Sequence, residues 1–193
     1  MLPVFAAFKI EAARQHGDTC SGSVVEKRNW CAWQSGPVFQ EDRKFYSHAG
    51  FNSREIRIAF MNWLWHDRPL RGASTITQQL ARSLFLSPRR SIGRKLMELR
   101  LAQYLERRFS KKGILYLYLN TAYLGAGTYG IQSASFRFWG KQAEDLNPAE
   151  IAFVLAHLPQ PDQCPSAAQC RSKVLLSRAG RLQNAIMQSC EAR

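Results

Sequence analysis

Apolar residues recur at intervals of three and four along most of the chain from about residue 53 onward, which is the spacing of one face of an α-helix. The stretch ILYLYL at 114–119 has the composition of a β-strand, but its surroundings are helical, so we expect a helix there as well. The pattern therefore predicts a mainly α protein, with helices over about residues 54–66, 76–86, 92–109, 111–120, 148–158 and 171–189.

Capping residues mark the starts of these predicted helices. Thr75, followed three positions later by Gln78, fits a capping box, in which each side chain satisfies a backbone amide of the other residue. Asn147, Pro148 and Glu150 predict a similar start, with proline at the first helical position. The other N-caps that we expect are Ser53, either Ser87 or Ser91, and Ser110.

The predicted helix over 92–109 combines an apolar stripe with a cluster of charges. Glu98 lies one turn from Arg94 and three residues from Lys95, and two such cations favour the ionised carboxylate. The group is either a fixed anion among phosphate-binding cations or an ordinary surface salt bridge. The stripe that we expect to face the core consists of Ile92, Leu96, Leu99, Ala102 and Leu105.

The chain divides into a short lead-in and one domain. Residues 1–36 show no sustained period and are predicted to be irregular, whereas 37–189 carry the helical pattern. With 193 residues and 46% apolar residues, the chain can form one domain with a real core. It contains no run of about 18 apolar residues, and its start lacks the basic region of a signal peptide. We therefore expect either another route of delivery or a missing native N-terminus.

Positive charge is concentrated in the middle of the chain. The formal net charge is +13, and residues 68–112 hold twelve Lys or Arg against two acids, Glu98 and Glu106. A segment with this excess of cations attracts anions. The anion can be nucleic acid, anionic lipid or a pyrophosphate.

The cysteines and histidines lack the spacing of metal ligands. The five cysteines include two close pairs, Cys20/Cys31 and Cys164/Cys170. These are either disulfides formed in an oxidising compartment or small thiols. Of the four histidines, we assign a role only to His48.

The segment EDRKFYSHAG at 41–50 contains the first candidate for acid–base chemistry. Glu41 and Asp42 lie at a predicted junction of loop and helix, beside aromatic residues and His48. A carboxyl group beside apolar rings is suited to proton transfer, because burial disfavours its charged form. The alternative is an acid that caps a helix.

The segment RGASTITQQLARSLFL at 71–86 is unusual for a solvent-facing helix. Short neutral side chains crowd its start, and arginines rather than a mixture of Lys and Glu surround them. Hydroxyl and amide groups can both donate to and accept from sugar hydroxyls, while Arg and helix N-termini bind phosphate. The neutral polar residues are Ser74, Thr75, Thr77, Gln78 and Gln79.

Two further segments each have a functional and a plain interpretation. AFMNWLWH at 59–66 is apolar all round, which suits either a membrane interface or a core helix. GAGTYG at 125–130 spells the glycine pattern of a dinucleotide site, but a mainly helical neighbourhood favours a tight turn.

Together these segments resemble the peptidoglycan glycosyltransferases of glycosyltransferase family 51, which include monofunctional transglycosylases and the transferase domain of class A penicillin-binding proteins. Five ordered motifs between about Val38 and Met187 carry the resemblance. The matching residues are Glu41, Asp42, Phe45, His48 and Gly50; Gly72 and Ser74 to Leu80; Arg94, Lys95 and Glu98; Ser110, Lys111, Ile114, Leu115, Tyr118, Leu119, Asn120, Gly125, Gly130, Gly140 and Lys141; and Leu146, Glu150, Ala152, Leu155 and Ala156.

Some positions depart from the pattern of that family. Ser83 stands where the family usually has Asn, and Tyr116 stands where it usually has Glu. Phe138 and Trp139 replace the usual Tyr-Phe pair, and residues 1–36 do not show the apolar run expected of the transmembrane anchor that usually precedes the domain. Both acids that the family uses are present, so these departures bear on the rate of turnover.

The resemblance implies a lysozyme-like α-helical domain over 37–189, with a smaller membrane-dipping lobe near residues 59–66. Its substrates would be lipid II, a disaccharide-peptide on a polyprenyl pyrophosphate, and the growing glycan chain. Its location would be the periplasmic face of the bacterial inner membrane. The partners that we expect are the membrane surface and other cell-wall synthesis proteins, and not nucleic acid.

On this basis we predict the roles of individual residues. Glu41 acts as the general base, and Glu98 orients the cations or holds a divalent metal ion, Mg²⁺ or Mn²⁺. The charge on the departing pyrophosphate is stabilised by cations rather than by a general acid. The predicted substrate-binding residues are Asp42, Phe45, His48, Ser74, Thr75, Gln78, Gln79, Arg82, Arg94, Lys95 and Lys141.

Three other functions compete with this one. A lysozyme-like hydrolase would also use carboxylates, but its neutral leaving group needs no cationic clamp. A basic nucleic-acid-binding module would explain the charge of +13 but not Glu41, His48 or the neutral polar block. A membrane-associated relative with weak activity would fit Ser83 and Tyr116. A transpeptidase is excluded, because the chain has no S-x-x-K or K-T-G motif.

Overall fold

The computed structural model describes residues 29–52, 74–87, 91–164, 166–167 and 169–191. Within these ranges the secondary structure consists of α-helices, two short 3-10 turns and an isolated bridge between Tyr123 and Tyr129. The predicted mainly α class is therefore confirmed, and it is consistent with a lysozyme-like helical domain. The predicted helix over 54–66, its Ser53 cap and the membrane-dipping lobe lie outside the described residues.

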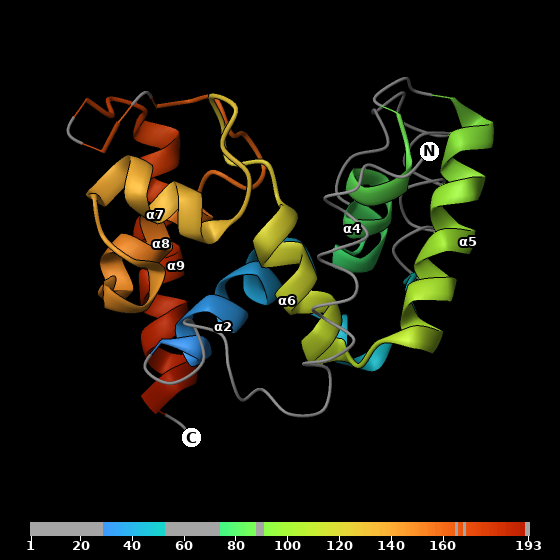
Figure 1. The fold of residues 1–193 in the computed structure, drawn as a ribbon. Helices are drawn as coiled ribbons and strands as arrows, with labels where there is room; N and C mark the ends of the chain where they lie inside the picture. The colour runs from blue at the N-terminus through green and yellow to red at the C-terminus, as the bar shows by residue number, and fades with distance from the viewer. Residues whose placement is uncertain (1–28, 53–73, 88–90, 165, 168, 192–193) are drawn as a thin grey trace, which may run out of the picture.

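The helices form two groups that are joined by a central pair. Figure 1 shows α4 and α5 on one side and α7, α8 and α9 on the other, with α2 and α6 between them. The elements are α2 (Trp30–Glu41), η1 (Phe45–Ser47), α4 (Ile76–Phe85), α5 (Ile92–Arg108), α6 (Lys111–Thr121), α7 (Ile131–Trp139), η2 (Ala143–Asp145), α8 (Pro148–Leu155) and α9 (Lys173–Glu191).

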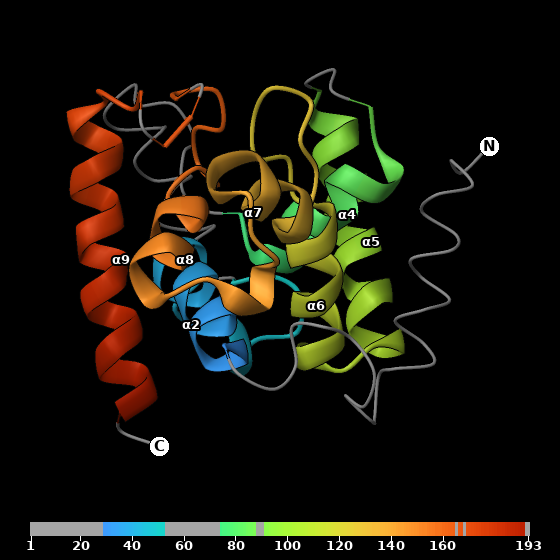
Figure 2. The same ribbon diagram turned by 60° about the vertical axis from the view of Figure 1, so that its left-hand side comes forward.

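The core runs through α6, which lies against α4 on one side and near α7 on the other (Figure 2). This is the ILYLYL segment, and it is helical as predicted. It is apolar almost all round because neighbours cover most of its surface. Its buried residues are Gly113, Ile114, Leu115, Leu117, Tyr118 and Leu119.

The helices begin at the residues that the capping pattern predicts. The side chains of Thr75, Ser91 and Ser110 each accept a hydrogen bond from the amide three residues later, at the starts of α4, α5 and α6. Asn147 forms a full capping box with Glu150 at the start of α8. At α4 only half of the predicted capping box forms, because the side chain of Gln78 bonds elsewhere.

Helix α2 begins at Trp30, inside the segment that was expected to be irregular. The expectation is therefore wrong for residues 30–36. Trp33 is fully buried, and its indole N–H donates to the carbonyl of Ala143 at 3.2 Å. This partner lies 110 residues away in the chain, so the contact that holds α2 in place cannot be predicted from the local sequence pattern. Residues 1–28 lie outside the described part of the chain.

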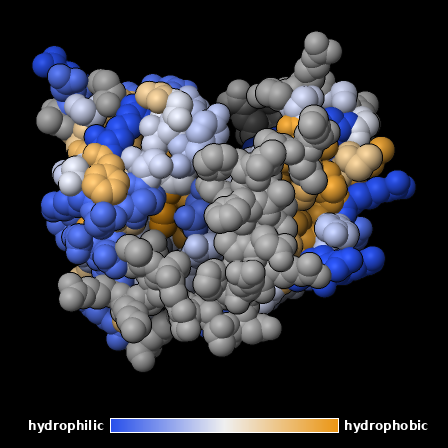
Figure 3. All heavy atoms as spheres, viewed as in Figure 1, coloured by the Kyte–Doolittle hydropathy of each residue, from blue (hydrophilic) through white to orange (hydrophobic). Residues whose placement is uncertain are grey.

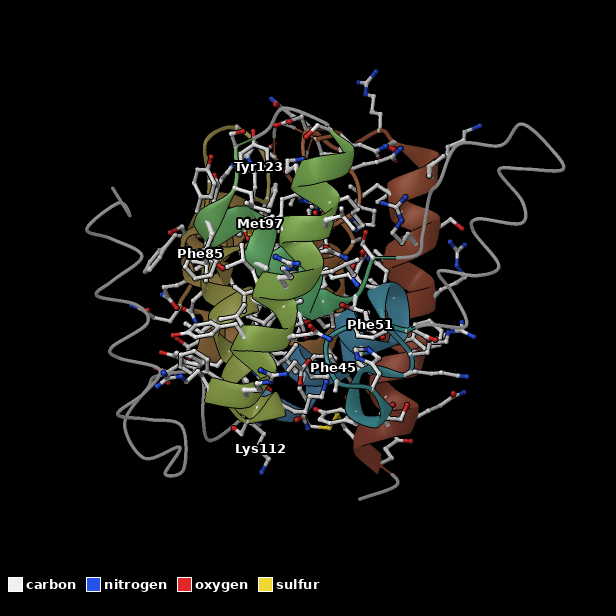
Figure 4. All side chains as sticks on the ribbon, turned by 90° about the vertical axis from the view of Figure 1, so that its right-hand side faces the viewer. Phe45, Phe51, Phe85, Met97, Lys112 and Tyr123 are labelled. Carbon is white, nitrogen blue, oxygen red and sulfur yellow. A yellow bond between two sulfur atoms is a disulfide. The ribbon has the colours of Figure 1, made fainter. Side chains whose placement is uncertain are left out.

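Helix α5 faces the core along only part of the stripe predicted from its sequence, since Ala102 and Leu105 are buried as expected. Leu96, a member of that stripe, is 58% exposed, whereas Glu98 has no exposed surface. The face that packs inward contains Glu98, Ala102 and Leu105. Figure 4 shows Met97 on the outer side of α5, and Figure 3 shows apolar surface between α4 and α5. The core side of α5 therefore holds the carboxylate of Glu98, while the apolar side chain of Leu96 lies on the exposed side.

Two disulfides link parts of the chain, and one differs from the predicted pairing. Cys164 bonds to Cys170, which is one of the two pairs suggested by the sequence. Cys31 bonds to Cys190 and not to Cys20, so the prediction for that pair is wrong. The Cys31–Cys190 bond joins α2 to the end of α9 across 159 positions of sequence, a pairing that only the packing of these two helices creates.

The GAGTYG segment forms a tight turn between α6 and α7, as expected. Gly125 has a φ angle of +95°, and a Cβ atom placed there would lie 2.1 Å from the carbonyl oxygen of Pro161. Both the backbone conformation and the close approach therefore require glycine. Within the described ranges, no helix is both long and apolar enough to cross a membrane.

Candidate active site

Glu41 is the last residue of α2, and two neutral amide groups hold its carboxylate. Gln40 Nε2 donates to Glu41 Oε1 at 3.0 Å, and Gln79 Nε2 donates to Glu41 Oε2 at 3.1 Å. The side chain is half-buried. Glu41 therefore keeps contact with solvent while its orientation is fixed by groups without formal charge.

Asp42 and His48 join the loop after α2 to the start of α4. The amide of Gly50 donates to His48 Nδ1 at 3.2 Å, so the proton of the neutral imidazole is on Nε2. His48 Nε2 then donates to Asp42, 2.9 Å from Oδ2. The same oxygen accepts the amide of Ile76, the first residue of α4, at 3.1 Å. Asp42 is 8% exposed, so its polar atoms are used to hold this junction.

Gly50 brings the end of this loop against two helices. Its φ angle is +91°, and a Cβ atom would lie 3.2 Å from the backbone of Ala102 in α5. Its carbonyl accepts hydrogen bonds from Thr75 Oγ1 at 2.7 Å and Gln78 Nε2 at 3.3 Å. The amide oxygen of Gln78, which a complete capping box would have used as its acceptor, accepts from Lys95 Nζ instead. The loop is therefore held directly against the first turn of α4.

Phe45 and Lys111 complete the support of the loop. Phe45 is fully buried (Figure 4), and the ammonium group of Lys111 lies 4.5 Å from the centre of its ring. Lys111 also donates to the carbonyl of His48 at 2.6 Å and to Glu106 Oε1 at 2.7 Å. Thr77 donates to the same Glu106 oxygen at 2.6 Å. This network ties α4, α5 and α6 to the residues that follow Glu41.

Glu98 lies on the core side of α5, and cations surround it. Its side chain has no exposed surface, so the interpretation as an ordinary surface salt bridge is wrong. Lys95 Nζ lies 2.5 Å from Glu98 Oε1, and Arg94 Nη1 lies 3.6 Å from Oε2. The Lys95 ammonium group also donates to Ser74 Oγ and Gln78 Oε1, both at 2.9 Å. Lys95 therefore connects the buried carboxylate to the start of α4.

The surroundings of Glu98 do not suit a divalent metal ion. Hard cations such as Mg²⁺ require several oxygen ligands, usually including carboxylates. Here the carboxylate oxygens face two basic side chains, which would repel a further cation. The described residues also contain no group of three or more His, Cys, Asp or Glu side chains placed to hold a metal ion. The residues present therefore do not fit the predicted role of Glu98 as a metal ligand.

Gln79 and Tyr118 extend the surroundings of Glu41. Tyr118 donates its hydroxyl proton to Gln79 Oε1 at 3.0 Å, while the amide nitrogen of Gln79 faces Glu41. Burial raises the pKa of Tyr118 well above its usual value, and the negative charge of Glu41 adds to this effect. Arg82 acts in the opposite direction and lowers the pKa of Tyr118. The charges of Glu41 and Arg82 therefore both act on the Tyr118 hydroxyl.

Lys141 and Ser83 bond to groups other than the two candidate acids, Glu41 and Glu98. Lys141 pairs with Glu150 at 2.6 Å, at the start of α8, and the structure does not bring it to Glu41 or Glu98 through any contact in the described ranges. Ser83 turns its hydroxyl back onto its own helix and donates to the carbonyls of Gln79 and Leu80. A serine that bonds to its own helix in this way does not project from it.

The predicted site residues differ in how exposed they are and in what they contact. Phe45, Thr75 and Gln78 are fully or nearly fully buried. Glu41, Ser74 and Gln79 are half-buried beside the first turn of α4, and Arg82 is exposed one turn further along. Asp42, His48, Arg94, Lys95 and Glu98 hold this arrangement together, whereas Lys141 lies apart.

Sequence reasoning missed the contacts of Gln40 and Tyr118. Tyr118 belongs to one of the motifs, but the motif does not say what its hydroxyl touches. Its partner Gln79 lies 39 positions away, so no local spacing reveals the pair. Gln40 precedes Glu41 directly, and an amide next to a candidate base was the one local signal that could have been used.

The sequence of this chain is similar to those of known proteins. Residues 32–188 match the family model described as "Transglycosylase". The chain is 44% identical over 171 residues to the "Biosynthetic peptidoglycan transglycosylase" of Klebsiella oxytoca, covering 83% of this chain and 70% of that protein.

Longer proteins also match. The chain is 42% identical over 148 residues to "Penicillin-binding protein 1A" of Aquifex aeolicus, covering 73% of this chain and 20% of that protein. It is 36% identical over 153 residues to "Penicillin-binding protein 1F" of Bacillus subtilis, covering 76% of this chain and 21% of that protein. The chain thus spans only about a fifth of the length of these penicillin-binding proteins.

Proposed function

Because this chain belongs to the transglycosylase family, the peptidoglycan glycosyltransferases, we propose that it polymerises lipid II into β-1,4-linked glycan strands. The observation that carries the proposal is the placement of two different carboxylates at one helix end. Glu41 reaches the first turn of α4 through Gln79, and Glu98 reaches it through Lys95. One acid is held by neutral amides and touches solvent, while the other is buried among cations.

Glu41 is the general base of the proposed reaction. It takes the proton from the 4-hydroxyl group of the acceptor sugar as that oxygen attacks C1 of the donor sugar. The bond between C1 and the pyrophosphate oxygen breaks, and the polyprenyl pyrophosphate leaves with the electron pair. A single displacement inverts the α-linked donor to a β-linked product. The half-buried carboxylate of Glu41 suits this role because it remains open to a substrate hydroxyl.

Glu98 has an indirect role in this mechanism. Its buried carboxylate is not open to a sugar, so it acts by holding Lys95 and Arg94 at the start of α4. A pyrophosphate is already a good leaving group and needs stabilisation of its charge more than it needs a proton. We assign that task to Lys95 and Arg82. No step passes through a metal ion on Glu98.

The remaining site residues position this machinery. Asp42, His48, Phe45 and Lys111 fix the loop after Glu41, and their polar atoms are already bonded within the protein. Ser74 and Gln79 remain half-buried and are the neutral groups that we assign to the sugar hydroxyls.

The outer face of α5 suits the polyprenyl chain. Leu96 and Met97 directly follow Lys95 and are 58% and 47% exposed. With Phe51 and Leu99 they line a pocket of about 510 Å³. An apolar chain attached to a pyrophosphate at Lys95 would reach this surface directly. The exposed apolar face of α5 is therefore the proposed seat for the first isoprene units.

The proposed location is the periplasmic face of the inner membrane. Two disulfides fit an oxidising compartment outside the cytoplasm. The substrate itself would hold the protein at the membrane surface. Contacts with other cell-wall synthesis proteins belong to the same proposal.

The decisive experiment is a polymerisation assay with purified protein and labelled lipid II, with and without moenomycin, the donor-site inhibitor of the family. We expect glycan chains that moenomycin abolishes, and a loss of about 10²–10⁴-fold in rate for Glu41→Gln. The matched control is Asp145→Asn, which neutralises an exposed acid on η2. Near-normal synthesis by Glu41→Gln would refute the assignment of the base.

The same preparation separates the competing functions. Incubation with finished peptidoglycan tests for a hydrolase, which would shorten the polymer instead of extending lipid II. A salt-sensitive shift of DNA without any dependence on lipid would favour the nucleic-acid-binding module. Either result in the absence of glycan synthesis would overturn the proposed function.

A further inference from the structure

The hydroxyl group of Tyr118 lies one hydrogen bond away from the residue that holds Glu41. Tyr118 donates to Gln79 Oε1 at 3.0 Å, and Gln79 Nε2 donates to Glu41 Oε2 at 3.1 Å. The three residues come from α6, α4 and α2, which are separate in sequence. Tyr118 is 3% exposed, so its side chain cannot take part in binding a substrate from solvent.

We propose that Tyr118 is a positioning residue, which orients the Gln79 amide so that its nitrogen holds the general base Glu41. This inference rests on the proposed function and deepens it. Tyr118 does not touch the reacting atoms and exchanges no proton with them. Its effect passes entirely through the side chain of Gln79.

The argument begins with the two ends of an amide group. The oxygen of Gln79 can only accept hydrogen bonds, and its nitrogen can only donate them. A carboxylate can only accept, so Glu41 needs the nitrogen end. Without a donor at Tyr118, the amide could rotate and present its oxygen to Glu41, which would repel the carboxylate. In the observed arrangement the Tyr118 hydroxyl donates to the oxygen end, and this leaves the nitrogen end for Glu41.

Tyr118 can serve as a donor only while it keeps its proton. Burial and the charge of Glu41 both raise its pKa well above the ordinary value, despite the opposing effect of Arg82. The hydroxyl therefore stays protonated over the neutral pH range. The negative charge of Glu41 therefore helps to keep the proton with which Tyr118 donates to Gln79, and that hydrogen bond in turn helps to position Glu41.

A neutral holder suits a base better than a cation does. Lys95 lies 2.5 Å from Glu98 and would compete strongly with an incoming hydroxyl if it faced a catalytic base in this way. Glu41 is instead held by the neutral amides of Gln79 and Gln40, which bind a carboxylate less strongly than an ammonium group does. A neutral amide that holds a base must itself be oriented by a further hydrogen bond, and Tyr118 donates that bond to Gln79.

The test is a double-mutant cycle with Tyr118→Phe and Gln79→Met, measured by the steady-state rate of lipid II polymerisation. We expect Tyr118→Phe to lower kcat about tenfold, with a change in KM below about threefold, because the ring still fills its site and only the orientation of Gln79 is lost. Gln79→Met should lower kcat at least as much. The double variant should be no slower than Gln79→Met alone, within about twofold.

The control is Tyr104→Phe, which removes an exposed tyrosine hydroxyl on α5, a residue that has no assigned role. Its kcat should remain within about twofold of the wild type. Thermal unfolding of every variant checks that the fold is retained. If Tyr118→Phe does not fold, Gln79→Met alone decides the matter, and a normal kcat for it would overturn the inference.

Other outcomes separate this inference from the function on which it rests. Polymerisation by the wild type together with an unchanged kcat for Tyr118→Phe would overturn the inference alone. So would a double variant whose losses multiply, because independent losses mean that Tyr118 does not act through Gln79. A wild-type protein that makes no glycan from lipid II would overturn the proposed function, and this inference with it.

Discussion

The Nζ atom of Lys95 lies 2.5 Å from Oε1 of Glu98, a carboxylate whose side chain has no exposed surface. Removing a carboxylate from water is costly, and a close cation with further hydrogen bonds offsets that cost. Lys95 also donates to Ser74 and Gln78, so a single ammonium group satisfies the buried acid and orders the start of α4. The stability of the fold and the charge at the proposed pyrophosphate site therefore depend on the same contact.

We expect Lys95→Met to lower the free energy of unfolding by about 2 kcal/mol, because it leaves the buried Glu98 with Arg94 as its one remaining ion-pair partner among the described residues. The value lies below that for a fully buried pair because the Lys95 side chain is 42% exposed. Adding Glu98→Gln should recover part of the loss, since it removes the unpaired charge. Urea denaturation measures both changes, and a double variant less stable than Lys95→Met would contradict the prediction.

Lys141→Met is the control for that experiment. Lys141 pairs with Glu150 at a similar distance, 2.6 Å, but Glu150 also accepts the backbone amide of Asn147. The carboxylate therefore keeps a partner when the lysine is removed. We expect a smaller loss of stability, about 0–1 kcal/mol, because Glu150 keeps that amide and the Lys141 side chain is 47% exposed.

Ser74 and Ser83 should respond differently to replacement by alanine. Ser74 accepts a hydrogen bond from Lys95, whereas Ser83 bonds back to its own helix. We expect Ser74→Ala to lower the polymerisation rate about tenfold, because Lys95 loses one of the groups that aim it. Ser83→Ala should keep the rate within about twofold. Steady-state assays with lipid II check both, and a large loss for Ser83→Ala would show that its hydroxyl serves the substrate.

The Cys31–Cys190 disulfide should stabilise the protein strongly, because it closes a loop with a sequence separation of 159. Changing both residues to Ser should lower the free energy of unfolding by roughly 2–5 kcal/mol. The matched control changes Cys164 and Cys170, which are separated by only 6 positions, and it should cost less. Denaturant unfolding measures both, and equal losses would contradict the dependence on loop length.

Acid should destabilise the protein partly through His157. Burial lowers the pKa of this fully buried imidazole from its ordinary 6.5, although its hydrogen bond to the Phe153 carbonyl acts in the opposite direction. The folded state therefore holds the neutral ring more strongly than the unfolded chain does. This contribution to stability is complete above pH 6.5 and is lost progressively as the pH falls below it.

His157→Leu tests that prediction, because it removes the titrating group while keeping an apolar side chain beside Phe138 and Phe153. We expect the variant to lose less stability than the wild type between pH 7.5 and pH 5, measured by urea denaturation at a series of pH values. Parallel curves for the two proteins would show that His157 does not titrate on unfolding.

Local patterns in the sequence determined α4, α5, α6, α8 and α9 and most of their ends, whereas α2 and α7 were not among the predicted helices. The caps at Thr75, Ser91, Ser110 and Asn147 form as predicted, because each bonds an amide within three residues of itself. The family motifs also identified Glu41 and Glu98 as the acids of interest. What those residues do within the site was a different question, because the motifs do not give their partners.

Only the tertiary structure decided which contacts these residues make. It buried Glu98 and exposed Leu96, paired Cys31 with Cys190, and set Lys141 beside Glu150. The physical reason is the range of the interactions. A cap depends on neighbours in the chain, whereas Gln79 meets Glu41 and Tyr118 across 38 and 39 positions, and only the packing of three helices brings them together.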